Sequence, residues 1–95
     1  MTADELAEFH GPHVAPPTPE HVKLTWHQPT PRASRIRVIS HTCECRETTY
    51  ELCAAAGQSF VRRTDRTEQT VHETPRTLAS IARHIFEQIL RGEAR

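Results

Sequence analysis

The sequence predicts an α+β fold: an antiparallel β-meander of about four to five strands, with one C-terminal amphipathic helix packed on one face. Two observations support this prediction. Short segments of alternating apolar and polar residues follow one another through the middle of the chain, separated by turn-forming residues. Near the C-terminus the apolar residues recur every three or four positions instead, which is the spacing of an amphipathic helix.

The expected strands are rich in β-branched and aromatic residues, as residues on a half-buried sheet usually are. They cover residues 22–26, 34–43, 48–54, 59–64 and 67–73. Gly57 suits the turn before residues 59–64, because glycine adopts a positive φ without strain. The short polar separations favour hairpins between neighbouring strands.

The C-terminal helix is expected to begin at Thr74 as its N-cap, with Pro75 in the first turn, and to stop at Gly92. One apolar stripe runs along it. The stripe consists of Leu78, Ile81, Ala82, Ile85, Phe86, Ile89 and Leu90. This stripe would bury one face of the sheet and leave the other face open.

Length and composition favour one domain behind a flexible segment. Residues 1–20 are expected to be a flexible N-terminal segment with a short helix at residues 2–9, and residues 21–95 a single α+β domain. The chain shows neither a secretory signal nor an apolar run long enough to span a membrane. We therefore expect a cytoplasmic protein that has no membrane partner.

The cysteines suggest a metal site. All three lie between positions 43 and 53. If Ile36, Val38 and Phe60 face the helix together with Tyr50 and Leu52, then one group of thiol and imidazole side chains shares the open face. That group is His41, Cys43, Cys45, Cys53 and His72, and zinc is the metal that such ligands would hold.

The spacing of these cysteines leaves two alternatives open. Structural zinc sites usually use two to four residues between paired cysteines, whereas Cys43 and Cys45 are separated by one. Half-buried cysteines on a strand are commonly inert. A redox pair of Cys43 and Cys53 across the hairpin is the other alternative.

The same open face would carry a binding surface of Arg35, Arg37, Ile39, Arg62 and Arg63. The sequence holds 12 basic and 12 acidic residues, so it lacks the positive net charge typical of nucleic-acid binding. Because no triad, paired carboxylates or glycine-rich anion loop is visible, an enzyme is not expected.

The favoured interpretation is a non-catalytic accessory or regulatory protein-interaction module, whose partner is another protein or a second copy of the chain. The alternative is a zinc- or thiol-dependent small regulator that contacts nucleic acid.

Overall fold

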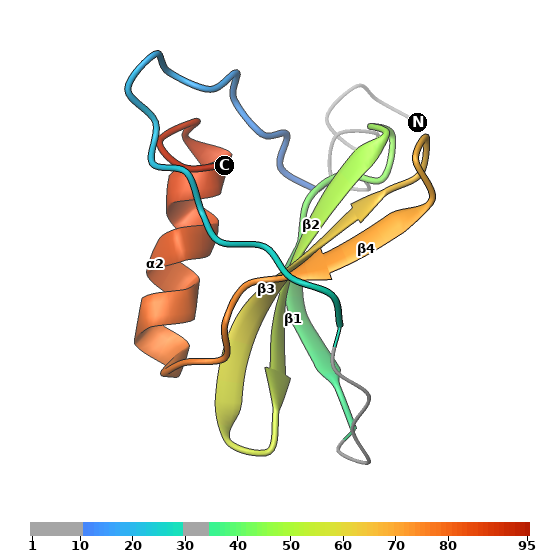
Figure 1. The fold of residues 1–95 in the computed structure, drawn as a ribbon, viewed down its shortest axis with the longest axis vertical. Coiled ribbons are helices and arrows are strands. Elements are labelled where there is room, and N and C mark those ends of the chain that lie inside the picture. Colours follow the sequence, from blue (N-terminus) through green and yellow to red (C-terminus); the bar gives the residue numbers. More distant parts are fainter. Residues whose placement is uncertain (1–10, 30–34) are drawn as a thin grey trace, which may run out of the picture.

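The computed structural model describes residues 11–29 and 35–95 and confirms the α+β fold. One sheet of four antiparallel strands, in the order β1-β2-β3-β4, lies beside a single C-terminal helix, α2 (Figure 1). The elements are β1 Arg37–His41, β2 Thr48–Ala55, β3 Gln58–Asp65, β4 Thr70–Glu73 and α2 Ala79–Leu90. The helix expected at residues 2–9 lies outside the described residues.

The β2–β3 hairpin is the centre of the sheet. The strands pair from Thr48 with Asp65 to Ala55 with Gln58. Ala56 and Gly57 connect them with φ values of 52° and 79°. Two positive φ values in a two-residue loop match the right-handed twist of the flanking strands. The turn predicted at Gly57 is therefore confirmed.

The main core lies between one face of β2 and β3 and the apolar face of α2. Leu52 and Val61 meet Ala82, Phe86 and Ile89 there, and all five are buried. The periodicity of the helical stripe explains this contact, because positions three and four apart share one side of a helix. Among the described residues, no helix has the length and apolar character needed to cross a bilayer.

The helix begins later than the sequence predicts, at Ala79 instead of directly after Thr74. Thr74 is buried and serves the sheet: its hydroxyl oxygen accepts a hydrogen bond from the Val61 amide at 2.9 Å. Thr77 then pairs with Ser59 through two backbone hydrogen bonds of 2.8 Å. Residues 74–77 therefore extend β4 along β3, and the predicted cap is engaged elsewhere.

The predicted strand phase is correct for Tyr50 and Leu52, which contact the helix cluster, but wrong for Phe60. Phe60 packs with Cys53 and Ala55 in a separate buried cluster. The phase is also wrong for Val38, which pairs with Cys53, because the register shifts between Val38 and Ser40. One inserted residue reverses the faces of the strand that follows it.

Residues 11–29, which we call the N-terminal strap, lie along the C-terminal end of α2 and then cross to the sheet (Figure 1). Ala15 donates a backbone hydrogen bond to the Leu90 carbonyl, and Val22 donates one to the Glu93 carbonyl. His27 bridges to Glu73 at the end of β4. The strand predicted at residues 22–26 is wrong: Val22 makes an isolated bridge to Ala94, and residues 23–26 form no strand of the sheet.

Candidate metal centre

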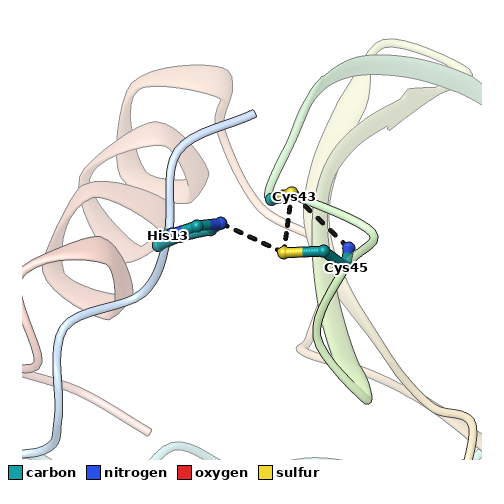
Figure 2. Close-up of side chains that lie close together, drawn as sticks. All are labelled: His13, Cys43 and Cys45. Atoms are coloured by element: carbon teal, nitrogen blue, oxygen red, sulfur yellow. Dashed lines mark hydrogen bonds between the residues drawn. The ribbon is translucent and has the colours of Figure 1, made fainter. Parts of the chain in front are cut away.

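Three potential metal ligands converge where the N-terminal strap passes the turn between β1 and β2. They are His13 from the strap and Cys43 and Cys45 from the turn, and their ligand atoms all lie within 4.8 Å of one another. Figure 2 shows the His13 ring directed at the Cys45 sulfur, which lies beside that of Cys43. The Cys45 sulfur is 3.2 Å from His13 Nε2 and 3.1 Å from the Cys43 sulfur.

These separations are close to those of a tetrahedral zinc site. With Zn–S bonds of about 2.3 Å and Zn–N bonds of about 2.0 Å, tetrahedral angles place two sulfurs about 3.8 Å apart and a sulfur and a nitrogen about 3.5 Å apart. The observed 3.1 Å between the sulfurs is therefore about 0.7 Å too short, and the 3.2 Å between sulfur and nitrogen is about 0.3 Å too short. Small side-chain rotations would open the cluster around an ion.

The turn positions both sulfurs through local hydrogen bonds. The buried hydroxyl of Thr42 accepts a hydrogen bond from the Tyr50 amide at 3.0 Å, which fixes the residue before Cys43 against β2. Beyond Cys43, the Cys45 amide donates to the Cys43 sulfur at 3.5 Å. An amide that points at a thiolate stabilises its negative charge, so this geometry suits a metal-bound sulfur.

Arg66 holds the rest of the turn. Its guanidinium donates hydrogen bonds to the backbone carbonyls of Glu44 and Arg46, and its amide donates to the Glu47 carbonyl at 2.9 Å. Three backbone carbonyls of the turn are thereby hydrogen-bonded to the loop that follows β3. The one-residue spacing between the two cysteines can then place both sulfurs on one side, because the chain here is a turn and not a strand.

The strap reaches the turn through a close backbone approach. The Cys43 amide donates to the Pro12 carbonyl at 3.0 Å, one residue before His13. A Cβ atom on Gly11 would lie 2.9 Å from the His41 carbonyl oxygen and 3.0 Å from the Cys43 nitrogen. The strap can therefore pass this close only with glycine at position 11.

Without a metal, the Cys43 thiol disfavours ionisation of the Cys45 thiol. The hydrogen bond with Cys43 is the largest cause that raises the pKa of the Cys45 thiol above its ordinary value, followed by desolvation. A metal ion reverses this preference, because a coordinated thiol loses its proton. Metal binding would therefore release protons from the pair.

The structure brings together two of the five residues expected to form a metal site, Cys43 and Cys45. The other three lie outside the described cluster. His41 Nδ1 donates to the Thr42 carbonyl at 3.0 Å, and His72 pairs with Arg63 in the sheet.

Cys53 is fully buried in the second core cluster. Desolvation there raises the pKa of its thiol to about 11. Such a thiol is neutral at ordinary pH, which suits packing and not metal coordination. Its strand partners are Val38 and Phe60, so Cys43 does not face it across the hairpin.

The residues expected to form a binding surface are dispersed. Arg62 makes an ion pair with Glu51 at 2.9 Å, and the Arg63 guanidinium lies 4.4 Å from the centroid of the Trp26 ring. The remaining three, Arg35, Arg37 and Ile39, are exposed on or beside the edge strand β1.

Sequence reasoning missed His13, which lies 32 positions before Cys45. It lies beyond the helix expected at residues 2–9, in the segment expected to be flexible. The one usable signal was the density of histidines, seven in the chain, of which His10 and His13 lie close to each other in the sequence. His10 is outside the described residues.

No family model, curated protein or solved structure matches this chain. The candidate site therefore rests on the geometry of the three ligands.

Proposed function

We propose that this chain is a small zinc-binding regulatory module, in which the metal joins the N-terminal strap to the β1–β2 turn. The observation that carries the proposal is the convergence of one imidazole and two thiols within 4.8 Å. Zinc is favoured over magnesium or calcium because thiolate and imidazole are soft or borderline ligands, whereas those ions prefer oxygen. A reducing cytoplasm would keep both sulfurs available.

The position of the cluster gives metal binding a conformational consequence. His13 belongs to the strap, whose backbone is hydrogen-bonded to the end of α2, whereas the cysteines belong to the sheet side of the molecule. Zinc binding would fix the strap to the turn, and zinc loss would leave fewer contacts there. Metal occupancy would therefore control how firmly the strap is held.

Metal analysis and cobalt substitution test this proposal. The purified full chain is expected to bind one Zn²⁺ per molecule, and Co²⁺ in the same site should produce sulfur-to-cobalt charge-transfer absorption. His13→Ala, Cys43→Ser and Cys45→Ser should each weaken binding by tenfold or more, since each removes a coordinated ligand.

Matched controls come from residues of the same types outside the cluster. His41→Ala, His72→Ala and Cys53→Ala should bind Zn²⁺ as the unmodified chain does. If the chain binds no metal, or if the Cys53 variant loses binding as strongly as the Cys43 variant, the proposal is wrong.

Protein interaction is a second candidate, favoured by the exposure of β1. This strand forms one edge of the sheet, and Val38 and Ile39 on it are 41% and 43% exposed. Such an edge can pair with a strand from a partner or a second copy. Ile39→Lys should abolish a dimer detected by sedimentation; a chain that is monomeric at all concentrations excludes a second copy as the partner.

Contact with nucleic acid has less support. Arg62 is committed to Glu51, Arg63 to Trp26 and Arg66 to turn carbonyls. These side chains already have partners that phosphate groups would have to replace. We therefore do not include nucleic acid in the proposed function.

A further inference from the structure

A cavity of about 450 Å³ adjoins the candidate metal centre. It lies between the N-terminal strap, the β1–β2 turn and the C-terminal end of α2, and its volume is in the range of small-molecule sites. His13 and Cys43 are both part of its wall. A metal held by these residues would border the cavity.

The coordination of that metal would be incomplete with the ligands described. Zinc takes four ligands in a tetrahedral arrangement, and sites with three protein ligands use the fourth position for water or a bound molecule. His13, Cys43 and Cys45 are three. Because two of them line the cavity, a molecule in the cavity can reach the fourth position.

The rest of the wall includes both charged and apolar residues. Arg46 and Arg95, each with a guanidinium group, line it together with Glu47. Within residues 11–29 and 35–95, neither guanidinium forms an ion pair. Val14 and Pro16 of the strap supply accessible apolar surface to the same cavity, and the buried side chains of Tyr50 and Ile89 lie behind it.

We propose that this cavity binds a small organic carboxylate, with one carboxylate oxygen in the fourth position of the metal and the apolar part against Val14 and Pro16. The proposal rests on the zinc-binding function proposed above. A site with two thiolates and one Zn²⁺ is neutral, so the guanidinium of Arg46 or Arg95 can pair with the carboxylate of a bound anion. An apolar chain on the anion would contact the apolar part of the wall, which an inorganic ion would leave without a partner.

Titration of the cobalt-loaded full chain with butyrate tests the proposal. Butyrate should shift the cobalt d–d spectrum with a saturating dependence on concentration, whereas butanol, which lacks the carboxylate, should not. Arg46→Ala and Arg95→Ala should each weaken butyrate binding by about tenfold, as expected for loss of one charge-assisted hydrogen bond. Arg91→Ala is the control, because Arg91 pairs with Glu93 and does not line the cavity.

The outcomes separate the two proposals. If Co²⁺ binds stoichiometrically but butyrate leaves its spectrum unchanged, the carboxylate site is wrong and the metal site stands. If His10→Ala alters the cobalt spectrum as strongly as His13→Ala, a fourth protein ligand occupies the remaining coordination position of the metal. The proposed carboxylate site is then also wrong. Equal binding of phosphate and butyrate would refute the apolar part of the site, and absence of Co²⁺ binding would refute both proposals.

Discussion

Replacing Gly11 by alanine should weaken zinc binding, although Gly11 provides no ligand. The added Cβ atom would lie 2.9 Å from the His41 carbonyl oxygen and 3.0 Å from the Cys43 nitrogen. Both atoms belong to the backbone and cannot rotate away. Ordinary contact begins near 3.4 Å, so the strap would have to withdraw by about 0.5 Å from the turn.

The energetic cost follows from this displacement. Moving the strap by about 0.5 Å would stretch the hydrogen bond between the Cys43 amide and the Pro12 carbonyl from 3.0 Å to beyond the normal range. Losing one such bond costs about 0.5–1.5 kcal/mol, and crowding at a packed position costs about 1–3 kcal/mol. Because His13 must reach the metal from this strap, we expect zinc affinity to fall by about tenfold or more, at 1.4 kcal/mol per factor of ten.

Competition for Zn²⁺ with a chromophoric chelator measures this change directly. Gly57→Ala is the matched control: its Cβ would meet nothing within 4 Å, but its φ of +79° is unfavourable for alanine. That variant should lose about 1–2 kcal/mol of stability and keep its zinc affinity, because Gly57 lies in the β2–β3 turn. Wild-type zinc affinity in the Gly11 variant, or equal losses in both variants, would refute the reasoning.

Four further predictions concern the core, the turn and the thiols. Ile89→Ala, at a fully buried helix position, should lower the free energy of unfolding by about 2–5 kcal/mol in urea denaturation, and a loss below 1 kcal/mol would contradict the assigned core. Arg66→Ala, which removes the side-chain hydrogen bonds to two turn carbonyls, should weaken zinc binding several-fold in the same chelator competition. Unchanged affinity would show that the turn keeps its conformation without Arg66. The Cys53 thiol, with a pKa of about 11, should be only about 0.1% ionised at pH 8 and should resist alkylation in the folded chain; rapid labelling at pH 8 would contradict its burial. Because the unfolded thiol loses its proton near pH 9.0, the free energy of unfolding should fall as pH rises from about 9 to 11. One equivalent of hydrogen peroxide should take two electrons from the zinc-bound thiolates of Cys43 and Cys45, close a disulfide, release Zn²⁺ and, with two protons from solvent, form two water molecules. Mass spectrometry and a zinc-sensitive dye detect the products, and overoxidation without a disulfide would show that the sulfurs do not meet.

The meander and the helix could be predicted from the sequence because their signals are local. Alternation within strands and the spacing of Ala82, Phe86 and Ile89 depend only on neighbours in the chain. The start of the helix could not be predicted, because the Thr74 hydroxyl accepts a hydrogen bond from the Val61 amide of β3, which lies far from it in the sequence. Thr74 and Pro75 form the local sequence pattern of a helix start, but the contact of Thr74 with β3 overrides that pattern.

The candidate site was predictable only in its local half. Cys43 and Cys45 stand out in the sequence, but their usefulness depends on a turn that Arg66 holds from beyond β3. His13 joins them through contacts between the strap and residues far along the chain. His72 was misplaced because β4 has the opposite phase from the one assumed: His72 pairs with Arg63, which pairs with Tyr50 on the face of the main core. Cys53 does lie on the face opposite Leu52, but Phe60 and Ala55 bury it there.

The 32-position separation between His13 and Cys45 makes a bound ion a cross-link. Closing a loop of that length removes many conformations from the unfolded chain, and by the relation used for disulfides this is equivalent to about 3–4 kcal/mol. The loop contains β1 and almost the whole strap. Loss of a bound ion would therefore remove one constraint that the edge strand and the strap share, while their own hydrogen bonds to β2 and to the end of α2 remain.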